Sequence, residues 1–162
     1  MLINNNYSYN QSFNGIKVKD GGIELLKKEG SSALLLVEQA KDECAKYKWH
    51  LNINPENYTL TSPSTKKTYA GPFSVKRHVK KNKNKPDEFT IIVRMNDGNR
   101  ENYTVSYDSM EEVQSVYKSV KNSMGIEKMV KLLHILERGF KLKALRHKLA
   151  NMTKFESSDL QA

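Results

Sequence analysis

Three lysines in the segment KDECAKYKWHLNI, residues 41–53, have the type and spacing to bind an anion. Lys41, Lys46 and Lys48 bracket a short polar stretch that ends at the single tryptophan of the chain, Trp49. Alternate residues of a strand face the same side of a sheet, so Lys46 and Lys48 can point together while Lys41 approaches from across a turn. Three ammonium groups around one anion supply charge-assisted hydrogen bonds to phosphate oxygens. The spacing predicts a phosphate site, and ordinary solvated lysines are the alternative.

Other basic residues are expected near this turn. Lys66 and Lys67 lie in the next predicted turn, at the same end of the strands, and Arg100 lies in a later hairpin turn. These three side chains are candidates to join the same anion site.

A second basic group lies in the run VKRHVKKNKNK, residues 75–85. It contains no acid and six cationic residues: Lys76, Arg77, Lys80, Lys81, Lys83 and Lys85. Such a loop attracts an anionic membrane, by about 1 kcal/mol for each basic residue near the surface, or the phosphates of RNA and DNA. No aromatic residues are interleaved to stack on bases, which argues against sequence-specific recognition of a single strand. A solvated basic loop is the alternative.

The last predicted helix, 125–150, forms a third candidate surface. It has seven basic residues against two acids, opposite an apolar stripe: Lys128, Lys131, Arg138, Lys141, Lys143, Arg146 and Lys148. A helix of this kind packs on its own domain, lies on a membrane or enters a groove of a partner. Packing on its own domain is the simplest of the three interpretations.

Residues for catalysis or metal binding are not apparent. The four histidines (His50, His78, His134 and His147) show no metal-ligand spacing with one another or with Cys44, and no glycine-rich phosphate loop or nucleophile elbow is present. We therefore assign no catalytic residue, no metal and no cofactor. The single cysteine excludes an internal disulfide and suggests a reducing compartment.

Composition limits the partners and the number of domains. A chain of 162 residues suits one domain with an added helix, and 27 Lys and Arg against 18 acids give a net charge of +9. This excess points to anionic partners, which include nucleic acid, acidic lipids and acidic protein. The longest apolar run, ALLLV at 33–37, is far shorter than the roughly 20 residues of a membrane span.

The elements that must position these residues follow from periodicity. A short helix is predicted at 22–29. The segment 33–39 is ambiguous, because the helix propensities of its residues favour a helix, whereas a short apolar run between polar residues favours a buried strand. We choose the strand. Alternating segments then predict antiparallel strands up to residue 107, with Asp-Gly in NDGN (96–99) as a hairpin turn. The spacing of apolar residues then changes from every second residue to nearly every fourth, which predicts a helix over 109–121. Its apolar stripe is Met110, Val113, Val116, Tyr117 and Val120.

An antiparallel meander closed by one helix resembles the pleckstrin homology superfold over residues 32–122. The resemblance follows the order ALLLVEQ, YKWHLNI, NYTLTSPSTKKTYAGPF, the NDGN hairpin and SMEEVQSVYKSV. Phosphoinositide-binding members carry basic residues at the end of strand one and on strand two, and Lys41, Lys46 and Lys48 match that spacing. The tryptophan usual on the closing helix is absent, and Val116 or Tyr117 takes its place, which leaves room for phosphotyrosine-binding or EVH-like relatives.

The sequence thus predicts an α+β protein with a partly open β-barrel closed by a C-terminal helix. We expect a flexible arm at 1–21, which lacks the features of a signal peptide, a PH-like domain at 22–124, an amphipathic helix at 125–150 and a disordered tail at 151–162. The expected function is non-enzymatic recruitment to anionic, phosphoinositide-containing membrane from the cytoplasm. Alternatives are a protein-interaction adaptor, which in a secreted bacterial effector would act in host cytoplasm, and a nucleic-acid binder that uses 75–85.

Overall fold

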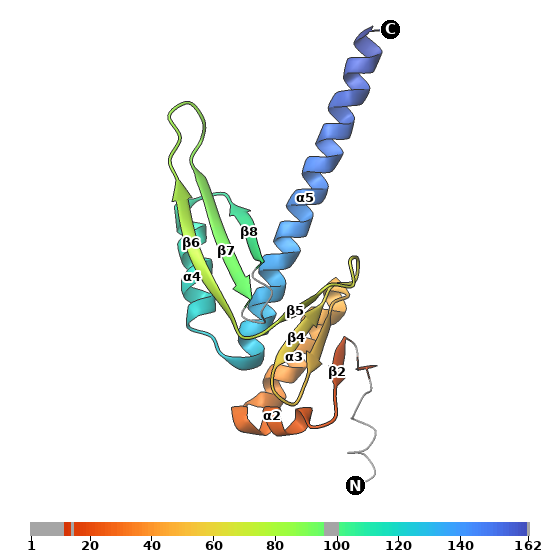
Figure 1. Ribbon diagram of the computed structural model, residues 1–162, viewed down its shortest axis with the longest axis vertical. Helices are drawn as coiled ribbons and strands as arrows, with labels where there is room; N and C mark the ends of the chain where they lie inside the picture. Colours follow the sequence, from red (N-terminus) through yellow and green to blue (C-terminus); the bar gives the residue numbers. More distant parts are fainter. Residues whose placement is uncertain (1–11, 14, 96–100, 162) are drawn as a thin grey trace.

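The computed structural model describes residues 12–13, 15–95 and 101–161, and the side chains of 15–95 and 101–152 within them. This part of the chain is an α+β protein with two separate sheets and a long C-terminal helix (Figure 1). The hairpin turn NDGN and Arg100 lie outside the described residues.

The first sheet has five strands in the order β1-β2-β3-β4-β5. They are β1 (Ser12–Phe13), β2 (Ile16–Val18), β3 (His50–Ile53), β4 (Tyr58–Thr61) and β5 (Thr68–Ala70). Strands β2 and β3 pair in parallel, and the other neighbours are antiparallel. A parallel pair needs a crossover connection, which here consists of helices α2 (Gly22–Glu29) and α3 (Ala33–Tyr47).

The second sheet is an antiparallel meander of three strands. It contains β6 (Phe73–Lys80), β7 (Glu88–Met95) and β8 (Asn102–Tyr107), and helix α4 (Met110–Lys121) packs on it. The Ser109 hydroxyl caps α4 by accepting a hydrogen bond from the backbone N–H of Glu112 at 3.1 Å. Val113 and Val120 of α4 are buried, Val116 is partly buried, and Met110 is 52% exposed.

Helix α5 (Gly125–Gln161) packs against both sheets with its first part. The indole N–H of Trp49, just before β3, donates to Glu137 at 2.7 Å, and the ring stacks on Phe140. On the other side, Gly139 lies so close to Val105 of β8 that a Cβ at Gly139 would be 3.1 Å from it. Six side chains of this part are almost fully buried: Ile126, Met129, Leu132, Leu133, Ile135 and Leu136.

A residue of α2 holds the N-terminal end of α5. The carboxylate of Glu29 accepts a hydrogen bond from the backbone N–H of Ile126 at 2.9 Å, which satisfies one of the donors that a helix start leaves free. Gly125 precedes it with φ +58, and a Cβ at Gly125 would fall within 2.0 Å of Glu29. The close approach of this carboxylate therefore requires glycine.

Several predictions are confirmed. Antiparallel strands dominate residues 50–107, and α4 matches the predicted helix at 109–121. Helix α2 has the predicted bounds of 22–29, and α5 begins at the predicted residue.

The predicted strand at 33–39 is wrong, because these residues belong to helix α3. Only Ala33, Ala40 and Cys44 of α3 are buried, whereas Leu34 and Leu35 are more than 70% exposed, so the apolar burst does not mark a buried strand. The predicted barrel is also wrong, since the two sheets do not close on each other.

The predicted ends of the domain also differ from the structure. Part of the expected arm at 1–21 forms strands β1 and β2, and α5 continues through most of the expected tail, to Gln161. The first part of α5 belongs to the core, so a boundary at residue 124 would divide one packed unit.

Candidate binding surfaces

The three lysines of the predicted phosphate site do not lie on paired strands. Lys41 and Lys46 belong to α3, and Lys48 is its C-cap, with φ 62 in the left-handed region. Alternate strand positions therefore do not bring these lysines together, because residues 33–47 form a helix. Lys46 lies in the last turn of α3, where a cation compensates the negative end of the helix dipole, and its ammonium is 5.2 Å from the Tyr47 ring.

Lys66 and Lys67 do lie at the same end of the first sheet as Lys48. The register of the sheet pairs His50 with Thr61 and Thr61 with Thr68, which places the segment before β3 beside the β4–β5 turn. Lys67, however, forms an ion pair with Glu101, whose carboxylate raises the pKa of this lysine. Its positive charge is thus already balanced by an acid of the same chain.

The second basic group forms one arm of the molecule, which we call the basic hairpin (residues 76–85). Lys76, Arg77 and Lys80 are exposed on β6, and Lys81, Lys83 and Lys85 are exposed in the connection to β7. Lys80 lies 3.9 Å from Glu88, and Arg77 stacks on Tyr117 of α4 at 5.3 Å. Within the described residues, the other four cations have no carboxylate partner.

The second arm is the distal half of α5, defined here as residues 141–152. Lys141, Lys143, Arg146 and Lys148 are all exposed in it, and no acid occurs between Arg138 and Lys154. None of the four has a carboxylate partner in the part of the chain that the structure describes. Lys141 instead lies 5.5 Å from the Tyr47 ring, and Arg146 donates a 3.4 Å hydrogen bond to Ser106.

An apolar stripe follows the same segment of α5. Leu142, Leu145, Leu149 and Met152 are spaced by three and four residues, which places them on one face of a helix. Leu145, Leu149 and Met152 are 53%, 53% and 51% exposed. By helical geometry, Lys141 and Lys148 lie along one edge of the stripe and Arg146 along the other.

The two arms extend from the body towards the same side, at the top of Figure 1. Helix α2 lies at the opposite end of the molecule. The sequence placed both basic runs on the surface, but it did not indicate that they share one side.

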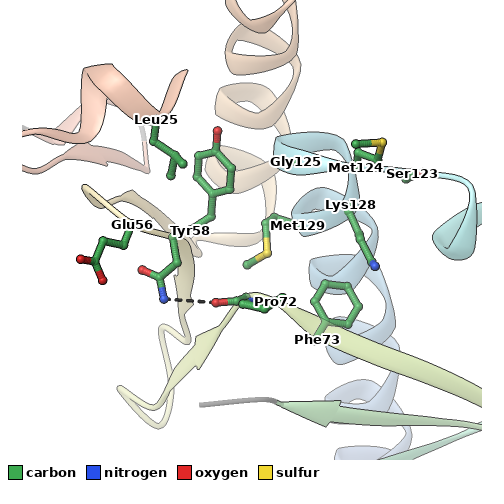
Figure 2. A pocket seen from close by; sticks show the side chains of 12 residues that line it. Leu25, Glu56, Tyr58, Pro72, Phe73, Ser123, Met124, Gly125, Lys128 and Met129 are labelled. Atoms are coloured by element: carbon green, nitrogen blue, oxygen red, sulfur yellow. Dashed lines mark hydrogen bonds between the residues drawn. The ribbon is translucent and has the colours of Figure 1, made fainter. Parts of the chain in front are cut away.

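A third feature, which no sequence pattern indicated, is a cavity of about 340 Å³. It lies where α2, the turn before β4, the β5–β6 connection and the start of α5 meet (Figure 2). Most of the cavity wall is apolar, and Glu56, Asn57, Ser123 and Lys128 contribute charged or polar side chains. The complete lining is Leu25, Glu56, Asn57, Tyr58, Gly71, Pro72, Phe73, Ser123, Met124, Gly125, Lys128 and Met129. These residues come from four separate segments, so no local motif could reveal the cavity.

Hydrogen bonds hold together two of the segments that line this cavity, the turn before β4 and the β5–β6 connection. The side-chain amide of Asn57 donates to the Gly71 carbonyl at 3.1 Å, and the Gly71 N–H donates to the Tyr58 carbonyl at 2.9 Å. Burial and the nearby Glu29 carboxylate raise the pKa of Tyr58 above its usual range. The Tyr58 hydroxyl is buried and has no well-formed hydrogen bond to any described residue.

Histidines and the cysteine do not form a reactive centre in the described residues. His134 lies 3.2 Å from Glu43, and no group of three or more potential metal ligands gathers anywhere in the described ranges. Cys44 is fully buried, and burial raises the pKa of its thiol to about 12. A thiol in this state is a poor nucleophile.

Comparison with known proteins adds no relative. No family model, no curated protein and no solved structure matches the chain. Among the described helices, none combines the length and the apolar character needed to cross a membrane.

Proposed function

We propose that the chain is a non-enzymatic binding module that docks on an anionic membrane surface through the basic hairpin and the distal half of α5. The observation that carries the proposal is the exposure of cations without carboxylate partners on two arms that extend to the same side. The protein would then act at the membrane periphery. A surface of negative lipid headgroups neutralises both arms at once, whereas a small anion reaches only one.

The charge on the arms is large enough for measurable binding. A basic residue held near an anionic membrane contributes about 1 kcal/mol. The hairpin offers six such residues and the distal half of α5 offers four. If half of them reach the surface, electrostatic attraction alone supplies about 5 kcal/mol. The attraction decays over a Debye length of about 8 Å at physiological ionic strength, so the binding must weaken as salt is added.

The apolar stripe of α5 supports the same orientation. Leu145, Leu149 and Met152 can enter the boundary between headgroups and acyl chains, while the flanking cations keep their charged ends among the phosphates. A second copy of the chain fits the stripe less well, because Lys141, Arg146 and Lys148 would face equal charges on the partner.

The architecture is compatible with a PH-like arrangement, which also supports a binding module. Strands β3, β4, β5, β7 and β8 followed by α4 keep the expected order, although β6 was not expected, the sheets stay open and α3 replaces the first strand. Because Lys41 and Lys46 lie on that helix, the proposal includes no pocket for a particular phosphoinositide headgroup. We expect binding to follow the total negative charge of the membrane.

Vesicle flotation tests the proposal. The chain should float with phosphatidylcholine vesicles that contain phosphatidylserine or a phosphoinositide at equal total charge, and it should remain unbound with phosphatidylcholine alone. Replacing Lys141, Lys143, Arg146 and Lys148 with Gln, or Lys80, Lys81, Lys83 and Lys85 with Gln, should each reduce the bound fraction strongly. The matched comparison is between two double variants. Lys81 and Lys83 to Gln in the basic hairpin should reduce binding, and Lys27 and Lys28 to Gln on α2, at the other end of the molecule, should leave it unchanged.

Three results would contradict the proposal. The first is equal binding to neutral and anionic vesicles. The second is an equal loss of binding in the α2 control and in the two arm variants, which would indicate a nonspecific effect of net charge. The third is the absence of vesicle binding together with salt-sensitive binding to a DNA or RNA duplex or to an acidic protein, which would assign the arms to that partner instead.

A further inference from the structure

The cavity of Figure 2 has the size and wall of a site for a small molecule. Its volume of about 340 Å³ falls within the range of roughly 300–1,000 Å³ that ligand sites occupy. Leu25, Phe73 and Met129 supply apolar surface from three different elements, and the Tyr58 ring is part of the wall. Sites for small molecules have this composition, with a mainly apolar wall and a few polar groups that set the orientation.

The two charged side chains of the cavity lie at opposite ends, as Figure 2 shows. Lys128, in the first turn of α5, holds its ammonium 5.1 Å from the centre of the Phe73 ring. Neither it nor Glu56, on the turn before β4, forms an ion pair with any described residue. The cavity therefore has an ammonium at one end and, at the rim of the other end, the exposed carboxylate of Glu56, which is directed outward (Figure 2).

This polarity determines which ligand fits. An ammonium placed against an aromatic ring has lost part of its hydration, so a carboxylate that reaches it gains a charge-assisted hydrogen bond. At the other end, Glu56 repels a second negative charge. The complementary molecule carries one anionic group at one end and an apolar body that covers the middle of the cavity.

We propose that this cavity binds a small amphiphilic monocarboxylate, with its carboxylate on Lys128 and its apolar body against Leu25, Phe73 and Met129. The site is separate from the two basic arms and does not depend on membrane docking. Met124, which lines the cavity and is 82% exposed, lies at its outer edge. Its flexible thioether can adapt to the apolar end of ligands of different length.

The test uses the full chain labelled with ¹³C at the methionine methyl groups and titrated with sodium octanoate below its micellar concentration. The resonances of Met124 and Met129 should shift and saturate, while that of Met110, at the start of α4 and outside the cavity, should not. Octanol and octylamine, which share the apolar chain but lack the carboxylate, should bind at least tenfold more weakly.

Two variants locate the charges. Lys128→Gln should weaken octanoate binding about tenfold or more and leave octanol binding unchanged, and Glu56→Gln should strengthen octanoate binding. Lys143→Gln, on the same helix but outside the cavity, is the matched control and should have no effect. An unshifted Met110 resonance in Lys128→Gln would show that the variant keeps its fold.

The proposal would be overturned by the absence of saturable shifts at Met124 and Met129, or by equal affinities for octanoate and octanol. Tighter binding of octylamine than of octanoate would also overturn it, because the anionic end would then be the recognition point. None of these outcomes depends on vesicles, so failure here leaves the proposed membrane docking untouched.

Discussion

Removing α5 should unfold the two sheets and the helices packed on them, because the first part of α5 belongs to the hydrophobic core. A chain that ends at residue 124 loses six side chains that are at most 3% exposed: Ile126, Met129, Leu132, Leu133, Ile135 and Leu136. Burial of one such side chain contributes about 1.5–3 kcal/mol, so the six together contribute about 9–18 kcal/mol. A domain of this size has a total stability of about 5–15 kcal/mol, and the loss therefore equals or exceeds it.

Trp49 provides the assay. Its indole donates to Glu137 and stacks on Phe140, so its fluorescence reports directly on the packing of α5. Fragment 1–124 should show solvent-exposed tryptophan emission and no cooperative thermal transition. Fragment 1–147, which keeps every buried residue of α5, should show native emission and a transition close to that of the full chain. A cooperative transition in fragment 1–124 would refute the assignment of α5 to the core.

Three further predictions test the packing and the titration of the body. Ser109→Ala should lower the free energy of unfolding by about 1 kcal/mol in urea titrations, because the Glu112 N–H loses its acceptor, and an unchanged midpoint would contradict the capping role. Gly22→Ala should cost at least about 2 kcal/mol, since the new Cβ would lie 2.2 Å from the Ile53 carbonyl oxygen; a neutral effect in the same titration would show that α2 shifts freely. Burial raises the pKa of Cys44 to about 12, so the folded state retains the thiol proton that the unfolded state releases, and stability should fall above about pH 9 by up to about 1.4 kcal/mol per pH unit. Cys44→Ala should reduce that slope, and an identical slope in both proteins would contradict this cause.

Periodicity predicted those elements whose exposed and buried faces differ clearly. Helix α4 combines buried Val113 and Val120 with exposed charged residues, and β3, β4, β7 and β8 bury residues at alternate positions. The strand predicted at the start of helix α3 was wrong, because the exposed Leu34 and Leu35 produce the same apolar run as a buried strand. The helical propensity of this segment predicted its structure correctly. The strand geometry that was expected to bring Lys41, Lys46 and Lys48 together is absent.

Features that depend on contacts between segments far apart in the chain could not be predicted from the sequence. Periodicity predicted a helix from residue 125, but not that Trp49 and Val105 would contact it from two sheets. The cavity likewise depends on segments that are far apart in the chain, and Lys128 appeared only as one of many basic residues of its helix. The cations at 76–85 are exposed as predicted, but the predicted loop is only partly correct, because residues 75–80 belong to strand β6.

Because α5 is one continuous helix, a small change of angle near its packed part produces a larger displacement at its far end. Its base is held by Glu29 at one end of the packed part and by Trp49 near the other, while the helix continues to Gln161 without a break. At 1.5 Å per residue, the 20 residues beyond Lys141 span about 30 Å. A bend of only about 10° near Lys141 would move the far end by about 5 Å. Small changes in packing at Gly139 against Val105 would thus alter the spacing between the two arms by several ångströms, without any change in the arms themselves.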